Sequence, residues 1–513
     1  MISLNRRLLA AFAAYGALAG FAQPPASRLN PLISKVVEEV SEERIAATMK
    51  KLESFGTRYV LSDKDNPTHG IGGAQRWIFE QFKSYSPRLQ VSLDPFTIKK
   101  SQRVPQDTDL NNVVAVLPGT TNKDRYIVIG GHYDSIATRR QPGGAANNQP
   151  NDDGPRSAAE TDPMAPGVSD DASGTAAVME LARVMSQYEF DKTIVFIAFA
   201  AEEIGLNGSA NYAKHAKETN TQIEAMLNND IIGNDISGDG RSANGRVRLF
   251  SEGPEDSPSR ALARYAKEIG ERYMPSMVVD LVFRRDRFGR GGDHTSFVRE
   301  GFAGVRFTTP SENYANQHSA TDTFANASPA YTSRVARING AVAASLALAP
   351  KPPVVSRPRP QGGFGAGGGG GRAAGTATTL AQPADAAAQP SQQPGQQSGR
   401  AGGRGLQMLG RGKGYDAALR WLNPNPEVDL AGYAIVIRAT TSPQWEREIY
   451  VGNVTEYTLP GLSIDDVIIG VKAIDKDGNA SLVAAYDQAP LAQQGQQQQQ
   501  QQRPATQNPG GDR

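Results

Sequence analysis

The chain has 513 residues, and its 54 basic and 53 acidic side chains leave a formal net charge of +1. This balance gives no reason to expect binding to nucleic acid or to an anionic membrane surface. The sequence contains no cysteine, so disulfides, thiol nucleophiles and zinc–thiolate sites are excluded, and any metal site must use oxygen and nitrogen ligands.

The N-terminal segment has the pattern of a secretory signal. Arg6 and Arg7 precede an uncharged run, residues 8–22, which ends in small residues before Gln23 and two prolines. A membrane anchor is the alternative, but a spanning helix needs about 20 apolar residues and this run is shorter. We therefore expect a signal peptide over residues 1–22, no stable membrane anchor, and a secreted or periplasmic protein.

Amphipathic helices alternate with apolar strands between residues 31 and 350. The segment after Ser41 has Ile45, Met49 and Leu52 at helical spacing, and Ser41 is a candidate N-cap. Further helices are predicted over residues 73–85, 174–188, 205–218, 259–273 and 331–349, and strands over residues 111–119, 125–135, 192–200, 223–232, 247–252 and 302–309. This alternation predicts an α/β/α sandwich around a mostly parallel mixed sheet.

The remaining segments differ in composition. Residues 138–166 are polar and aperiodic, which predicts a long loop inserted in the sandwich. Residues 351–412 are rich in Pro, Gly, Ala and Gln and predict a linker, and residues 491–513 predict a glutamine-rich disordered tail. Between them, residues 413–490 contain short, regularly spaced strands that predict a small all-β sandwich. This unit resembles a fibronectin type III domain, with Trp421 as its early core tryptophan, and is a candidate for contact with a surface or polymer.

Ligand-type side chains gather at the predicted strand ends, where the active site of an open α/β sheet lies. These residues are His132, Asp134, Asp170, Asp171, Glu202, Glu203, Asp230 and His318. Each alone has an ordinary structural explanation, such as a helix cap for the Asp170–Asp171 pair. Together they predict a pair of zinc ions, because zinc binds imidazole and carboxylate groups and a carboxylate can bridge two ions. One carboxylate of Glu202–Glu203 would bind metal, and the other would act as general base.

The same residues carry a family resemblance. The segments GGHYDS, APGVSDDASGTAAVMELAR, VFIAFAAEEIGLNGS, LNNDIIG and HSATDTF resemble, in order, the motifs of metallopeptidase family twenty-eight, which includes aminopeptidase S, aminopeptidase Y and bacterial leucyl aminopeptidases. The resemblance covers roughly residues 40–350 and implies a zinc exopeptidase domain with two zinc ions. The implied zinc ligands are His132 and Asp230 for one ion, Glu203 and His318 for the other, and Asp170 as the bridge. The resemblance also implies that Glu202 is the general base and that Asp134 orients His132.

The resemblance implies hydrolysis of the N-terminal peptide bond of peptides with a free N-terminus. Some family members place a tyrosine before an S-D-H segment to bind the oxyanion, but here that segment reads GRGGDH. Arg290 or Tyr314 is a candidate substitute for this donor. Arg290 is equally a candidate to hold a substrate carboxylate, which would favour a carboxypeptidase or dipeptidase. A single-zinc glutaminyl cyclase and a non-catalytic binding protein on the same fold are further alternatives.

Overall fold

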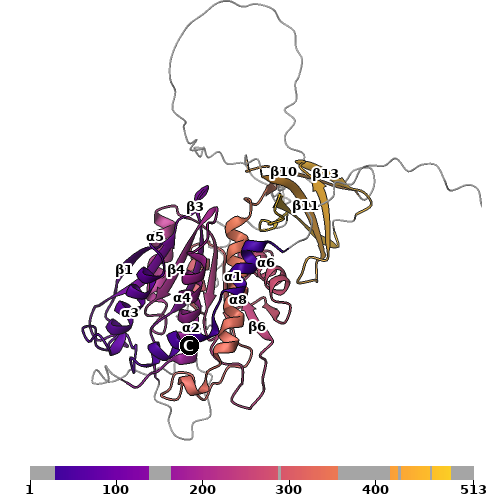
Figure 1. Ribbon diagram of the computed structural model, residues 1–513. Helices are drawn as coiled ribbons and strands as arrows, with labels where there is room; N and C mark the ends of the chain where they lie inside the picture. Colours follow the sequence, from indigo (N-terminus) through magenta and orange to yellow (C-terminus); the bar gives the residue numbers. More distant parts are fainter. Residues whose placement is uncertain are drawn as a thin grey trace, which may run out of the picture.

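The computed structural model describes residues 29–137, 163–286, 291–355, 416–425, 429–462 and 465–486. The predicted signal peptide and tail, most of the inserted loop and linker, and Arg290 lie outside these residues. The described chain forms an α/β/α sandwich with a smaller β-sandwich beside it (Figure 1). No helix among the described residues combines the length and apolar character that a membrane crossing requires.

The larger region is built on an eight-stranded mixed sheet, in the order β1-β2-β4-β3-β5-β8-β6-β7. Its strands are β1 (Gln90–Ile98), β2 (Thr108–Leu117), β3 (Asn122–His132), β4 (Lys192–Phe199), β5 (Gln222–Asn229), β6 (Arg246–Phe250), β7 (Val278–Val282) and β8 (Gly304–Thr308). Four of the seven pairings are parallel, including the three that join β4, β3, β5 and β8. The predicted fold class, with a mostly parallel mixed sheet, is confirmed.

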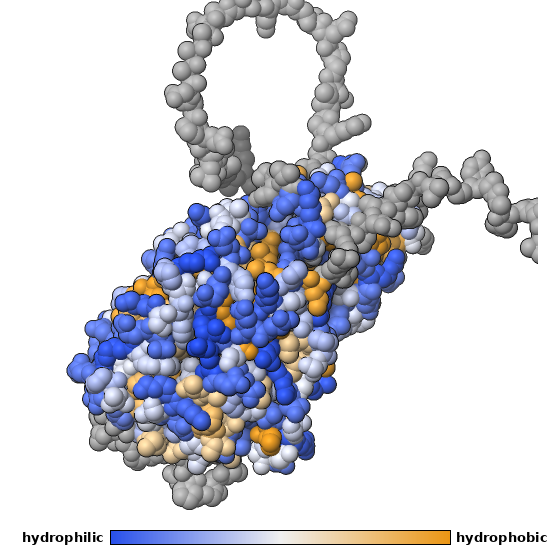
Figure 2. Space-filling model, viewed as in Figure 1, coloured by the Kyte–Doolittle hydropathy of each residue, from blue (hydrophilic) through white to orange (hydrophobic). Residues whose placement is uncertain are grey.

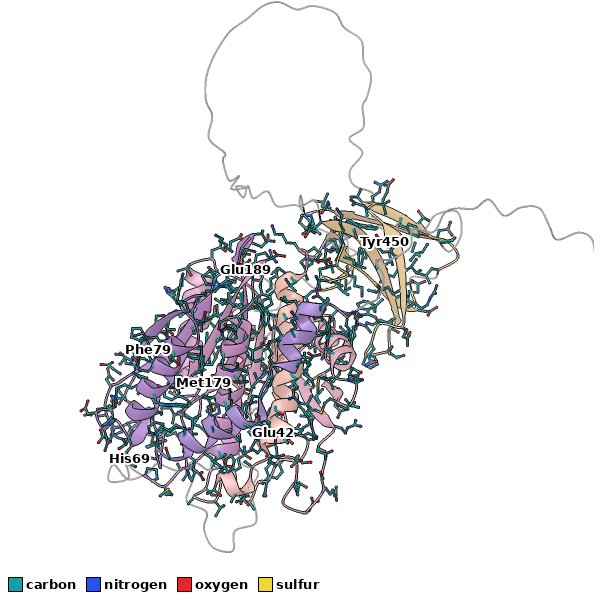
Figure 3. All side chains as sticks on the ribbon, viewed as in Figure 1. Glu42, His69, Phe79, Met179, Glu189 and Tyr450 are labelled. Atoms are coloured by element: carbon teal, nitrogen blue, oxygen red, sulfur yellow. The ribbon has the colours of Figure 1, made fainter. Side chains whose placement is uncertain are left out.

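Helices cover both faces of this sheet. They are α1 (Pro31–Glu38), α2 (Glu42–Glu53), α3 (Gly70–Tyr85), α4 (Ser173–Met185), α5 (Asn207–Glu218), α6 (Pro258–Tyr273), α7 (Asp293–Arg299) and α8 (Pro329–Leu348), with short turns η1 (Val168–Ala172) and η3 (Phe324–Asn326). Helices α5 and α7 cover one face, and the other helices share the large apolar core on the opposite face. Met179 of α4, labelled in Figure 3, is fully buried in that large core.

Local sequence explains which elements were predictable. The Ser41 side chain accepts a hydrogen bond from the Arg44 backbone N–H, and Ile45, Met49 and Leu52 are buried, so the predicted cap and helix face are confirmed. Strand β1 was not predicted, because it is a mostly exposed edge strand and therefore lacks a continuous apolar run. The same reason applies to β7, a short edge strand whose residues are largely accessible.

The β-sandwich consists of two antiparallel sheets around their own apolar core. One sheet contains β9 (Val354–Val355), β10 (Ala417–Leu422) and β13 (Glu456–Leu459), and the other contains β11 (Leu430–Ala439), β12 (Arg447–Gly452), β14 (Val467–Asp475) and β15 (Ala484–Ala485). The buried Trp421 ring lies edge-on to Tyr433, with 5.5 Å between centroids. Residues 351–355, where composition predicts linker, instead belong to this unit because β9 pairs with β10. The fibronectin type III resemblance stays a prediction.

Buried ion pairs join the β-sandwich to α6. Arg438 of β11 is 1% exposed and donates hydrogen bonds to both carboxylate oxygens of Asp256, at 2.7 and 2.8 Å. Arg264 of α6 donates to Asp256 at 3.1 Å and to the Pro443 carbonyl at 2.8 Å. Most of the face seen in Figure 2 is hydrophilic, and hydrophobic residues reach its surface in scattered patches. The two regions are thus packed together through this boundary.

Candidate active site

The site lies at the carboxyl edge of three adjacent parallel strands. Strand β3 ends at His132, Glu202 and Glu203 follow the end of β4, and Asp230 follows β5. Because these strands are neighbours, their ends bring together side chains that are far apart in sequence. Turn η1 adds Asp170 from the start of α4, and the loop after β8 adds His318.

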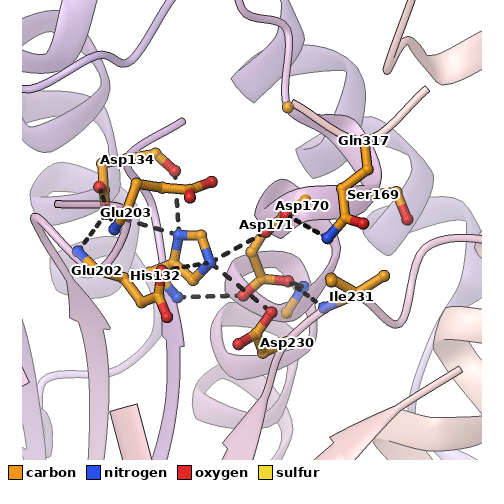
Figure 4. A network of polar contacts seen from close by, with 12 residues as sticks. His132, Asp134, Ser169, Asp170, Asp171, Glu202, Glu203, Asp230, Ile231 and Gln317 are labelled. Atoms are coloured by element: carbon orange, nitrogen blue, oxygen red, sulfur yellow. Dashed lines mark hydrogen bonds and ion pairs between the residues drawn. The ribbon is translucent and has the colours of Figure 1, made fainter. Parts of the chain in front are cut away.

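Two clusters of side chains share Asp170. In the His132 cluster, His132 Nε2 lies 3.2 Å from Asp170 Oδ1 and 3.9 Å from Asp230 Oδ1 (Figure 4). In the His318 cluster, His318 Nε2 lies 3.0 Å from Asp170 Oδ2 and 3.1 Å from Glu203 Oε2. The three ligand atoms of each cluster lie within 4.8 Å of one another. Asp170 therefore presents one oxygen to each cluster, as a carboxylate that bridges two cations would.

The donor atoms of both clusters fit zinc, which binds imidazole nitrogen and carboxylate oxygen. Among the described side chains, His132 Nε2 and Glu203 Oε1 are buried and have no hydrogen-bond partner. Buried polar atoms are ordinarily paired, and although other described side chains share this state, these two atoms belong to ligand-type side chains of the clusters. A cation in each cluster would satisfy both atoms.

The electrostatics of the clusters also favour cations. Burial lowers the pKa of His132, but the carboxylates around it, Asp170 among them, outweigh that effect and raise it well above its usual range. The pKa of His318 is raised in the same way, against burial, by Glu203 and Asp170. Burial raises the pKa of Glu203 and, together with neighbouring carboxylates, that of Glu202. The clusters therefore hold more negative charge than their own side chains balance, and positive charge stabilises them.

Asp134 fixes the segment that carries the two glutamates. Its Oδ1 accepts a hydrogen bond from the Glu202 backbone N–H at 3.2 Å, and its Oδ2 accepts one from the Glu203 N–H at 3.3 Å. The Asp134 carboxylate lies 3.6 Å from His132 Nδ1, whereas the Asp134 backbone carbonyl lies 3.1 Å from it. The hydrogen bond that orients the imidazole therefore comes from the Asp134 backbone, and the carboxylate positions the Glu202–Glu203 backbone.

The adjacent aspartates of η1 have different surroundings. Asp171 is fully buried and accepts hydrogen bonds from the backbone N–H groups of His132, Gly174 and Ile231, at 2.9 to 3.3 Å. These contacts tie β3, α4 and the end of β5 together behind the clusters. Asp170 instead directs its two oxygens at the two histidines.

Sequence reasoning missed two residues that hold Asp170. The Asp322 carboxylate accepts hydrogen bonds from the backbone N–H groups of Ser169 and Asp170, at 2.9 and 3.0 Å. The Gln317 side-chain amide donates to Asp170 Oδ2 at 3.1 Å. Burial raises the pKa of Asp322 to about 7. Gln317 adjoins His318 in the sequence, and Asp322 lies within the segment HSATDTF, but neither residue was assigned a role at the site.

Three residues beside the clusters have left-handed backbone conformations that non-glycine residues rarely adopt. The φ angles are 62° at Ala201, 60° at Ile231 and 54° at His318. For the β-branched Ile231 this conformation is strained, and its backbone is held by hydrogen bonds to Asp171 and Thr309. Strain of this kind concentrates at functional sites, where the surrounding structure fixes it.

Only one of the two candidate oxyanion donors lies among the described residues. Arg290 lies outside the described residues. Tyr314 is 47% exposed on the loop between β8 and η3, and it belongs to neither cluster. The role of each residue stays a prediction.

Comparison with known proteins identifies the family of this chain. Residues 112–343 match the family model described as Peptidase family M28. Two proteins named probable zinc metalloprotease, from Pyrenophora teres f. teres and Pyricularia oryzae, are 32% and 33% identical to this chain, and each alignment covers 89% of this chain and 86% of the relative. The fold and the donor set define a zinc-dependent metallopeptidase. The chain belongs to peptidase family M28, so the predicted family is confirmed.

Solved structures show more distant likenesses. The Legionella pneumophila LapA aminopeptidase is 22% identical, with a TM-score of 0.46 over 64% of this chain and 78% of that chain. A glutaminyl cyclase from Fimbriiglobus ruber is 18% identical, with a TM-score of 0.44 over 63% of this chain and 98% of that chain.

Proposed function

We propose that this protein is a di-zinc aminopeptidase that removes the N-terminal residue of peptides. The observation that carries the proposal is the pair of clusters that share Asp170. Two cations held by one carboxylate suit a hydrolytic displacement, because they can stabilise the attacking and the leaving groups together. The proposed occupancy is one zinc ion with His132 and Asp230 and a second with Glu203 and His318.

Glu202 is the proposed general base. Bound zinc would supply polarisation of the scissile carbonyl and a water of lowered pKa. The Glu202 carboxylate belongs to neither cluster, and its Oε2 lies 4.0 Å from His132 Nε2. It accepts the proton of the attacking water and delivers it to the nitrogen of the leaving amine. Asp134 supports this role because it holds the backbone N–H of Glu202.

A small pocket beside Asp170 supports selection of the substrate N-terminus. Its lining consists of Ser169, Asp170, Ile231, Asn234, Asn313, Asn316, Gln317, Asp322 and Asn326. The described lining thus contains two carboxylates and five amides, without lysine or arginine. The carboxylate and amide oxygens of this lining can accept hydrogen bonds from the N–H groups of a substrate α-amine.

Two further parts of the proposal concern segments beyond the site. Residues 1–22 would direct export to the periplasm or the medium, because they have a basic start followed by a short uncharged run. The β-sandwich, as a fibronectin type III-like unit, would contact a surface or polymer. Neither part affects the chemistry at Asp170.

The test is metal content measured together with activity on the full chain, purified without chelator. The substrates are aminoacyl-nitroanilides, N-blocked peptides and glutaminyl peptides. The expected result is about two zinc ions per chain, with cleavage only of substrates that have a free N-terminus. One zinc ion with cyclisation of glutaminyl peptides would replace the proposal with a cyclase, and cleavage of N-blocked peptides at their C-terminus would replace it with a carboxypeptidase.

A further inference from the structure

We propose that Arg306 is a positioning residue for Asp230: it anchors one carboxylate oxygen, so that only the other oxygen faces the His132 cluster. This inference rests on the proposed function, because it concerns the same metal site. Arg306 is not part of either cluster, and no local sequence pattern marks it.

Arg306 occupies a fixed position in the sheet. It lies on β8, opposite Asn228 of β5 and Phe250 of β6, and it is 1% exposed. Its Nε lies 3.1 Å from Asp230 Oδ2. The Nε–H does not point along a hydrogen bond to this oxygen, so the contact is an ion pair between buried groups. Such a pair depends chiefly on the position of the charge.

The far side of the guanidinium is also anchored. Arg306 Nη1 donates hydrogen bonds to Asp286 Oδ2 at 2.9 Å and to the Gly291 carbonyl at 3.1 Å. An arginine remains protonated at all relevant pH values, so it is a permanent positive charge between two aspartates. Asp286 therefore fixes Arg306, and Arg306 in turn fixes Asp230.

The surroundings leave little room for Asp230 to change its orientation. A Cβ atom at Gly292 would lie 2.9 Å from Asp230 Oδ2 and 3.2 Å from Arg306 Cδ. A side chain at position 292 would therefore require Asp230 or Arg306 to shift. The Asp230 oxygen that remains, Oδ1, faces His132 Nε2 in the His132 cluster.

Among the described residues, Glu203 of the His318 cluster has no corresponding ion pair with an arginine. Glu203 Oε1 is buried without a hydrogen-bond partner among the described residues, so both Glu203 oxygens can turn toward a cation. Asp230 offers one oxygen and Glu203 offers two, which makes the two metal positions different. Arg306 is the residue that creates this difference.

The test measures zinc binding by the full-length chain and by Arg306→Met, in competition with a chromophoric chelator. Loss of a residue that orients a metal ligand weakens binding by about 10- to 100-fold. We expect a loss of this size in Arg306→Met for one of the two ions, and a changed visible spectrum of the Co²⁺-loaded protein. In Arg306→Lys, which keeps the charge, we expect a smaller loss. Equal zinc affinity and an unchanged Co²⁺ spectrum in Arg306→Met would overturn the proposal.

A matched control is Arg248→Met on β6. Arg248 also forms an ion pair with a buried carboxylate, that of Glu312, at 2.5 Å, but it contacts no cluster residue. We expect its zinc affinity and Co²⁺ spectrum to match those of the unaltered chain. If Arg248→Met lost zinc as much as Arg306→Met, the effect would be general destabilisation and the proposal would fail.

Two further outcomes keep the inference testable. If Arg306→Met does not fold, Asp286→Asn removes the far anchor and keeps the arginine, and it should weaken zinc binding relative to the unaltered chain. Unchanged binding in both Asp286→Asn and Arg306→Lys would contradict the proposal. If the unaltered chain binds zinc but cleaves no peptide, the proposed function fails, while the zinc affinities of the variants still decide the role of Arg306.

Discussion

The balance of buried positive and negative charge differs between the candidate active site and the boundary with the β-sandwich. At the boundary, Arg438 and Arg264 meet Asp256 at 2.7 to 3.1 Å, so the protein itself supplies both signs of charge. At the site, four carboxylates, those of Asp170, Glu202, Glu203 and Asp230, gather around His132 and His318. Buried charge is costly unless it is paired. Balanced buried charge therefore holds the two regions together, whereas the excess of carboxylates at the site favours the binding of a cation.

The largest effect is expected for Glu202→Gln, which removes the proposed base without removing a cluster residue. General acid–base catalysis contributes about 10²- to 10⁴-fold, so kcat should fall by that factor while zinc content stays the same. Steady-state kinetics and metal analysis measure the two quantities. Glu218→Gln, on the exposed end of α5, is the matched control and should keep full activity. Turnover near that of the unaltered chain would remove Glu202 from the mechanism.

Arg438→Met removes one of the two arginines that pair with Asp256 at the boundary. Breaking a buried ion pair costs about 3–5 kcal/mol, and we expect the low end because Asp256 keeps Arg264 as a partner. Denaturant unfolding measures the free energy, and zinc content should not change. The control is Arg420→Met, which breaks an exposed pair with Glu456 and should change stability by less than about 1 kcal/mol. Equal losses in both variants would show that the boundary pair has no special weight.

Zinc removal tests the candidate active site, where carboxylates are in excess. A ligand that binds only the folded state at a hundredfold excess over its Kd stabilises it by about 2.7 kcal/mol. Chelation should therefore lower the thermal midpoint, and added zinc should restore it. Arg438→Met should show the same zinc-dependent shift, because its substitution is remote from the clusters. A midpoint that does not respond to zinc would mean that the clusters hold no ion.

Asp475 should give the smallest effect. This β14 carboxylate accepts two hydrogen bonds from Asn479, and burial raises its pKa from 3.8 to about 6. The folded chain then binds the proton more tightly than the unfolded chain, so stability is highest below about pH 4 and is lost as pH rises through 6. With allowance for solvent screening, we expect a loss of about 1 kcal/mol. Unfolding free energies between pH 4 and 7 should lack this decline in Asp475→Asn, and parallel curves would refute the assignment.

Residues at strand ends could be proposed from sequence because each one follows a recognisable apolar run. His132, Glu202 and Asp230 are of this kind, and the order of the strands brings them together. The alternation of helices and strands likewise predicted the sandwich. Edge strands such as β1 (Gln90–Ile98) were missed, since their exposed residues produce no such run.

The roles of residues that hold the site from other segments of the chain could not be predicted. Asp322 holds the Ser169 backbone across 153 residues of sequence, and Arg306 meets Asp230 only because β8 lies beside β5. Their roles depend on pairing between strands and loops, which leaves no periodic pattern in the chain. The two roles of Asp134 could likewise be assigned only from the structure. Its backbone carbonyl contacts His132, and its carboxylate accepts hydrogen bonds from backbone N–H groups.

The ion pair between Asp256 and Arg438 links the two regions of the chain in evolution. The two residues are 182 positions apart, and each is buried against the other's region. Loss of the β-sandwich would leave Asp256, which precedes α6, with Arg264 as its remaining arginine partner. We therefore expect the two regions to be retained as a pair.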